Sequence, residues 1–249
     1  GVSRHQLDLA LARHVENLGG VVKTRSRFPL PEGAAEGMVD AGGRRAVRGG
    51  LTGIKVHAGP MPLAGELEGH LGDGAYLGIA AVEDGWLNAC GLFRPRPGLR
   101  APKDRLLLEY LRASGLEGVA DRLGEAGIRE GSASICSGVA CRVWPLSDPS
   151  GPMPVGDRWA VIPPFTGNGM SMAIESAMEA VGPLRDWSRG LIEWRAANRR
   201  LARNLSRRFR FRMPVARALH PFLLKPPLSA GLALFARTGM VPFRALFAV

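Results

Sequence analysis

The first regular pattern of apolar positions lies close to the start of the chain. Apolar side chains recur there at helical spacing, at Leu7, Leu11, Val15 and Leu18. With Ser3 as a candidate N-cap, this pattern predicts a helix over residues 3–18, and the glycine pair at 19–20 would end it. The two valines at positions 21 and 22 then predict the start of a short strand.

Between residues 51 and 144 the pattern changes to short apolar runs that turn residues separate. The runs are LTGIKVHA, GAYLGIAAVEDGWLNACGLF and SICSGVACRVWPL. Asp84-Gly85 can adopt the positive φ angles of a tight turn, so the middle run predicts a β-hairpin. Leucines at helical spacing over residues 103–123 predict one or two helices. We therefore expect an antiparallel sheet with helices on one side.

Residues 156–180 form the most informative segment. A short run, VGDRWAVIPP, leads through FTGNG into MSMAIESAM, whose composition favours a helix. The glycines at 167 and 169 let the backbone turn tightly and approach a ligand with no Cβ in the way. The start of a helix presents unpaired N–H groups and the positive end of the helix dipole. This arrangement suits an anion or the electron-rich edge of a ligand.

Composition excludes several classes of protein. Of the 249 residues, 46% are hydrophobic and 22% charged, which are ordinary values for a folded globular chain and exclude wholesale disorder. No stretch approaches the roughly 18 consecutive apolar residues of a membrane-spanning helix. Three cysteines provide no even disulfide framework and fit the reducing cytoplasm, where we expect the protein to be located.

The net charge of +11 belongs to one end of the chain. Residues 185–249 contain 14 basic and 2 acidic side chains, a charge of +12, whereas residues 1–184 contain 19 basic and 20 acidic ones, a charge of −1. This distribution argues against nucleic-acid binding over the whole chain, and we expect no specific nucleic-acid partner.

The basic region has two interpretations. Its arginines share one helical face and have apolar neighbours, which suits an anionic membrane surface; they are Arg195, Arg199, Arg203 and Arg207. A solvated, arginine-rich closing helix explains the same pattern, and the sequence leaves the two open. The first interpretation predicts peripheral contact at the inner face of the membrane.

The string VGDRWAVIPPFTGNGMSMAIESAMEA resembles the second flavin-contact motif of a superfamily that unites FAD-dependent monooxygenases and geranylgeranyl-reductase-like enzymes. In that family, of the para-hydroxybenzoate-hydroxylase-type fold, a Gly-Asp pair closes a strand and a Pro-x-x-Gly-x-Gly turn opens a helix beneath the flavin ring. Gly156-Asp157 and residues 164–169 match these elements. Three further segments agree in order. SRHQLDLALARHVENLGG is similar to a helix that begins with an FAD-contacting arginine, VDAGGRRAVR to an Asp-Ala-x-Gly-Arg turn, and the hairpin run above to a substrate-domain hairpin.

The resemblance extends to about residue 215 and implies an α/β (α+β) fold class. Residues 1–50 and 151–184 would form an incomplete Rossmann-like FAD-binding domain, with an antiparallel β-sheet substrate domain inserted at 51–150. Residues 185–249 would form a basic helical C-terminal region. The family's G-x-G-x-x-G unit, which holds the FAD pyrophosphate, has no counterpart in the sequence. We expect either a fragment or a chain that has lost its pyrophosphate site.

The resemblance implies FAD as the cofactor and NAD(P)H as a candidate electron donor. Asp157 would accept a hydrogen bond from a ribityl hydroxyl, and Arg4 would contact phosphate or ribityl oxygens. Backbone N–H groups of the turn would meet the pyrimidine edge of the flavin ring. The implied cofactor contacts are Arg4, Asp157, Pro164, Gly167, Asn168, Gly169 and Met170. Arg158 and Trp159 replace small residues of the family, so we expect bulk beside the ribityl chain.

These features predict a flavin-dependent oxidoreductase that acts on an apolar, carrier-linked or lipid-linked substrate by hydride transfer through the flavin. Its reaction would be that of a reductase, a dehydrogenase or a monooxygenase. Because the cofactor performs the chemistry, no catalytic side chain is assigned, and the five histidines show no metal-ligand spacing. The alternative is a degenerate, non-catalytic domain that binds a partner or an anionic membrane surface.

Overall fold

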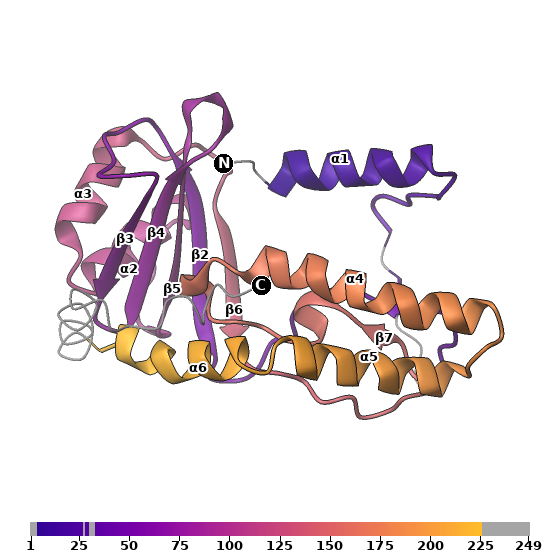
Figure 1. Ribbon diagram of the computed structural model, residues 1–249. Helices are drawn as coiled ribbons and strands as arrows, with labels where there is room; N and C mark the ends of the chain where they lie inside the picture. The colour runs from indigo at the N-terminus through magenta and orange to yellow at the C-terminus, as the bar shows by residue number, and fades with distance from the viewer. Residues whose placement is uncertain (1–3, 27, 30–32, 226–249) are drawn as a thin grey trace.

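The computed structural model describes residues 4–26, 28–29 and 33–225 (Figure 1). Its helices are α1 (Arg4–Asn17), α2 (Leu106–Arg112), α3 (Glu117–Ala126), α4 (Gly169–Ser188), α5 (Trp194–Arg208) and α6 (Arg212–Leu223). Its strands are β1 (Val39–Asp40), β2 (Leu51–Ala58), β3 (Leu67–Gly72), β4 (Ala75–Ala81), β5 (Leu87–Phe93), β6 (Ser134–Val139) and β7 (Met153–Pro154). Short 3-10 turns include η1 (Glu83–Gly85), η3 (Gly156–Arg158) and η4 (Pro164–Thr166).

The larger sheet has the strand order β3-β4-β5-β2-β6, and every neighbouring pair is antiparallel. Strand β2 alternates buried and half-buried positions along its whole length. Its buried side chains pack with leucines of α2 and α3, of which Leu107, Leu111 and Leu123 are fully buried. The expected antiparallel sheet and its pair of helices are therefore confirmed.

The hairpin between β4 and β5 is also confirmed. Asp84 and Gly85 have φ angles of 60° and 75°. These are the left-handed conformations that aspartate and glycine tolerate best, so the Asp-Gly pair reverses the chain with little strain.

The two expected helices lie on one side of this sheet, and the end of α6 reaches its other face. Tyr76 and Leu92 lie on the opposite face and pack with Leu223 and Leu224 at the end of α6. Strands β4 and β5 carry apolar side chains at successive positions, so apolar side chains point to both faces of the sheet. Those on a face that nothing covers would stay exposed to water, which is unfavourable.

Strands β1 and β7 form a separate parallel pair, in which Val39 lies opposite Met153. Helices α4, α5 and α6 pack around this pair in one core. Buried positions of α5 recur every three or four residues between its arginines, and they are Trp194, Ala197, Asn198, Leu201 and Leu205. The basic region therefore contributes to the same core as the Gly-Asp segment.

Helix α1 confirms the helix expected near the start, although its proposed N-cap, Ser3, lies outside the described residues. None of the residues of α1 is buried. The strand expected from residue 21 is wrong, because this segment pairs with no other described strand and Val21 is 81% exposed. No helix in the described part of the chain is both long and apolar enough to cross a membrane.

Helix α4 is held against the Gly-Asp turn by a fully buried serine. The Gly156 N–H donates to Ser176 Oγ at 2.7 Å, and the Ser176 hydroxyl donates to the Ala173 carbonyl at 2.7 Å. Gly156 has a φ of 58°, and a Cβ placed on it would lie 3.4 Å from Ala173 Cβ. Glycine therefore allows both the conformation of the turn and its close approach to the helix.

We predict that Ser176→Ala lowers the free energy of unfolding by about 1–3 kcal/mol, because the Gly156 N–H loses its acceptor. Urea unfolding measures the change. The matched control is Ser188→Ala in the same helix, since the Ser188 hydroxyl is exposed and bonds only the Arg185 carbonyl. Equal effects of the two substitutions would show that the Gly156 contact contributes nothing.

Candidate functional site

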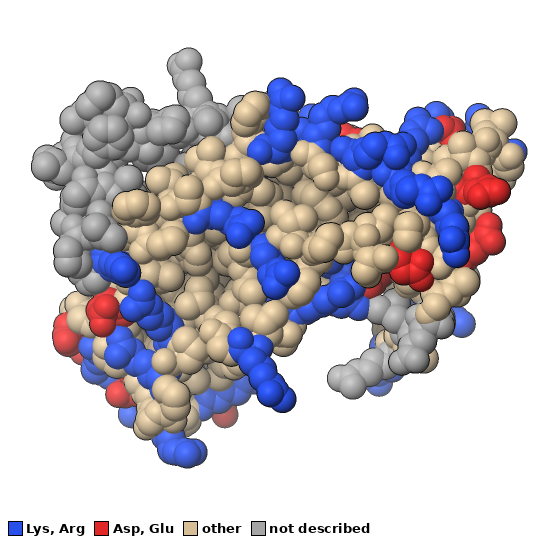
Figure 2. All heavy atoms as spheres, turned by 90° about the horizontal axis from the view of Figure 1, so that it is seen from below, with Lys and Arg blue, Asp and Glu red and all other residues tan. Residues whose placement is uncertain are grey.

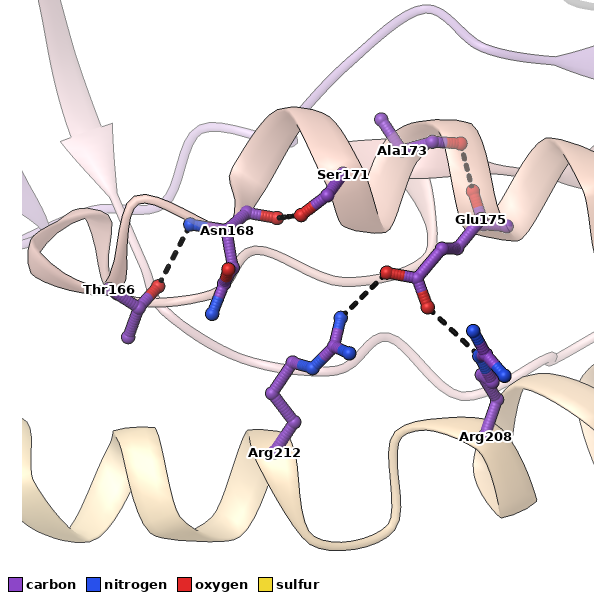
Figure 3. A network of polar contacts seen from close by, with 8 residues as sticks. Thr166, Asn168, Ser171, Ala173, Glu175, Arg208 and Arg212 are labelled. Carbon is purple, nitrogen blue, oxygen red and sulfur yellow. Dashed lines mark hydrogen bonds and ion pairs between the residues drawn. The ribbon is translucent and has the colours of Figure 1, made fainter. Parts of the chain in front are cut away.

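The start of α4 is built by the turn that precedes it. Gly167, with a φ of 67°, connects η4 to the helix in a conformation that favours glycine. The buried Thr166 hydroxyl donates to the Pro163 carbonyl at 3.0 Å and accepts from the Asn168 N–H at 3.3 Å (Figure 3). Sequence reasoning missed Thr166, although a threonine beside a glycine turn commonly forms such bonds.

Backbone N–H groups of residues 167–170 were expected to face a ligand. Two of these four donate hydrogen bonds within the turn, and the other two have no acceptor there. The Gly167 N–H donates to the Pro164 carbonyl at 3.0 Å, and the Asn168 N–H donates to Thr166. The N–H groups of Gly169 and Met170 have no acceptor among the described residues, because the first bond of the helix runs from Met172 to Asn168. A Cβ placed on Gly169 would meet no atom within 4 Å, so the turn is open there.

Asp157 is a half-buried carboxylate in the η3 turn, and it makes no hydrogen bond or ion pair with another described residue. Burial raises the pKa of its carboxyl, and the positive charges of Arg4 and Arg44 oppose that shift. Arg4 is itself exposed and pairs with Asp8 at 3.1 Å. The structure thus places Arg4 within electrostatic range of Asp157 but shows no direct bond between them.

The two large side chains that follow Asp157 are each held by another part of the chain. Arg158 forms an ion pair with Asp40, which also accepts a hydrogen bond from the Gly42 N–H at 2.9 Å. Trp159 is buried against Phe209, with ring centroids 5.3 Å apart. The ion pair and the core therefore determine where these two side chains point, and the expected bulk beside a ribityl chain stays a prediction.

A cluster of rings joins the large sheet, η4 and α6. Phe165 lies parallel to His220 with centroids 6.3 Å apart, and the Tyr76 hydroxyl lies 3.4 Å from His220 Nε2. Burial lowers the pKa of His220 and raises that of Tyr76, so both groups are neutral at physiological pH. Sequence reasoning missed this pair, because 144 residues separate its members. The cluster forms an apolar wall with a single polar pair, next to the turn that opens α4.

The half-buried thiol of Cys141 lies near Tyr76 of this wall. Burial, followed by the charge of Asp157, raises the pKa of Cys141 to about 11. The thiol therefore stays protonated and is a weak nucleophile.

The Asp40–Arg158 pair lines a hollow of about 240 Å³. Arg45 and Trp144 line it, and the guanidinium groups of Arg45 and Arg142 lie 5.7 and 4.4 Å from the centroid of the Trp144 ring. Asp40 and Asp148 also line the hollow, so its lining combines positive and negative side chains and indicates no particular ligand.

Comparison with protein-family models and with curated proteins gave no match. The fold nevertheless matches solved structures. FqzB is 18% identical with a TM-score of 0.65, and the match covers 98% of this chain and 66% of that one. PqsL from Pseudomonas aeruginosa, a probable FAD-dependent monooxygenase, is 14% identical with a TM-score of 0.53, over 88% of this chain and 55% of that one. HpxO from Klebsiella pneumoniae, crystallised with FAD and uric acid, is 14% identical with a TM-score of 0.52, over 78% of this chain and 50% of that one.

These likenesses show the fold. The chain has the architecture of FAD-dependent monooxygenases, which confirms the expected fold class and the resemblance at the level of structure. It spans about half the length of PqsL and HpxO. The closer likeness to the geranylgeranyl-reductase-like branch stays a prediction.

The raised pKa of Asp157 has a consequence for stability. A carboxyl with a raised pKa binds its proton more tightly in the folded state, so its charge destabilises the fold above that pKa. We predict that Asp157→Asn raises the urea midpoint of the ligand-free protein at neutral pH. The gain should shrink as pH falls through the raised pKa, where Asp157 is protonated.

Asp148→Asn is the matched control with the opposite sign. Hydrogen bonds from the Ser150 hydroxyl and N–H lower the pKa of Asp148, so its charge stabilises the fold above the unfolded-state pKa. Asp148→Asn should lower the midpoint at neutral pH. A midpoint that falls for Asp157→Asn as well would contradict the account of Asp157.

Proposed function

We propose that this chain binds a flavin at the start of α4 and acts as a flavin-dependent oxidoreductase. One observation carries the proposal: the carboxylate of Asp157 and the N–H groups of Gly169 and Met170 have no partner among the described residues, at an open turn. They occur in a chain with the fold of FAD-dependent monooxygenases.

The residues at the turn fit the flavin end of FAD. Asp157 can accept hydrogen bonds from ribityl hydroxyls, and the two N–H groups can donate to the carbonyl oxygens of the pyrimidine edge. Pro164 and Gly167 shape the turn, and Gly169 removes the Cβ that would block a flat ring. The sequence contains no G-x-G-x-x-G loop for the pyrophosphate, so the fit covers the flavin ring and the ribityl chain.

A bound flavin supplies the hydride-transfer chemistry. The chain's own contribution is to hold and orient. The positive end of the α4 dipole favours negative charge at the pyrimidine edge and so favours the reduced ring. The wall of Phe165, Tyr76 and His220 would exclude water and orient an apolar substrate through its one polar pair. NAD(P)H is the electron donor that we propose, and the proposal includes both reduction and oxygenation.

Binding of riboflavin, FMN and FAD to the purified chain tests this proposal. We expect all three to bind with similar affinity, since nothing in the sequence matches a pyrophosphate loop. Asp157→Ala should weaken each by about 10- to 100-fold, which corresponds to the loss of hydrogen bonds to a charged acceptor. Quenching of flavin fluorescence measures the dissociation constants.

Asp121→Ala is the matched control, because Asp121 is an exposed carboxylate of α3 whose surface pair with Arg112 contributes little. It should leave flavin binding unchanged. A chain that is folded but binds none of the three flavins would contradict the proposal and would favour the non-catalytic domain. Equal loss in both variants would remove Asp157 from the site.

A further inference from the structure

The arginines of α5 and α6 fall into two structural classes. Those that point towards α4 are paired: Arg200 with Asp186 at 2.6 Å, and Arg208 and Arg212 with Glu175 at 2.9 and 2.8 Å (Figure 3). Burial alone would raise the pKa of Glu175, but the hydrogen bonds from the two arginines outweigh it and hold the pKa low. These arginines hold the helices together.

The second class points away from the core. These side chains are exposed, and none forms an ion pair with a described residue; they are Arg195, Arg199, Arg203, Arg207, Arg210, Arg217 and Lys225. In α5 they recur every four residues, on the side opposite the buried Leu201 and Leu205. Like charges gathered without ion-pair partners repel one another and do not stabilise a fold, which favours a role for them at the surface.

Apolar side chains are exposed on the same stretch of chain. Phe211 and Phe222 are 62% and 43% exposed, and between them α6 also exposes Pro214, Ala218 and Pro221. The Arg210 guanidinium lies 4.5 Å from the centroid of the Phe211 ring. Exposed cations and exposed aromatic rings therefore occur on the same stretch of chain, as on helices that lie in a membrane interface.

Figure 1 shows α5 and α6 following one another along the lower side of the molecule. Seen from below, basic side chains are spread over this side, and the middle of the face shows no acidic side chain (Figure 2). The middle of this side therefore presents basic side chains with no acidic ones between them. We call this face, formed by the exposed cations and apolar residues of α5 and α6 named above, the basic face.

We infer that the basic face docks on an anionic lipid bilayer, with its arginines at the lipid phosphates and Phe211 and Phe222 inserted between the headgroups. Charge complementarity argues for an anionic partner, and the exposed apolar rings argue for lipid rather than a polyanion in water. The sequence that follows, residues 226–249, is mostly apolar and contains two arginines and no acid. This inference is independent of flavin binding.

Flotation of the full chain with phosphatidylcholine vesicles, with and without phosphatidylglycerol, tests the inference at physiological ionic strength. We expect binding only to the vesicles that contain the anionic lipid. The triple variant R199Q, R203Q and R207Q should weaken it by about a hundredfold, at about fivefold for each arginine. The control variant R13Q, R25Q and R48Q removes the same charge from exposed positions elsewhere and should have little effect.

The variant F211S and F222S separates lipid from other anions. It keeps every charge and should weaken vesicle binding by about tenfold or more, because the apolar insertion is lost. All positions are exposed, so each variant should keep the wild-type melting temperature. Failure of the wild type to bind anionic vesicles would overturn the inference. An equal loss of vesicle binding in the two triple variants would also overturn it. So would RNA binding that is tighter than vesicle binding and that the F211S and F222S changes leave unaltered.

Discussion

The hydrogen bond between Gly156 and Ser176 fixes the Gly-Asp turn on helix α4, and the rest of the site depends on that contact. On another side of the same helix, Glu175 accepts hydrogen bonds from Arg208 and Arg212 and so positions α5 and α6. The N-terminus of α4 carries the two N–H groups that have no described acceptor. Helix α4 therefore contacts both the turn that carries Asp157 and the helix that carries His220. A site of this kind is organised before any ligand binds.

Partly buried carboxylates of this protein differ in whether an arginine donates hydrogen bonds to them. Glu175 is compensated by arginines, and in the large sheet a hydrogen bond from Arg122 lowers the pKa of Glu68 to about 2. Asp157 is half-buried without such a partner, and burial raises its pKa. A half-buried carboxylate with no hydrogen-bond partner destabilises the folded chain, and groups with such a raised pKa are typical of functional sites. The same contrast separates the paired arginines facing α4 from the unpaired ones of the basic face.

Local patterns predicted much of the fold. The Asp-Gly hairpin, the helix that begins at Arg4 and the turn that opens α4 all depend on residues close in sequence, and all are present. Local patterns did not predict the contacts between elements that are far apart in the chain. The valines at 21 and 22 form no strand because no described strand pairs with them, and the end of α6 packs on Tyr76 and Leu92 of the large sheet, far from it in sequence. The backbone N–H groups of Gly167 and Asn168 donate hydrogen bonds within the turn. Composition alone cannot predict these bonds.

The sequence by itself determined the turn at residues 164–169 and the charge of the C-terminal region, since each is encoded by neighbouring residues or by simple sums, and it indicated the class of fold through its resemblance to a known family. Only the tertiary structure decided which groups meet. It brought Tyr76 to His220 across 144 residues, turned Arg158 to Asp40, and divided one run of arginines into paired and unpaired sets. The physical reason is that pairing and burial depend on the packing of elements far apart in the chain, which periodicity does not specify.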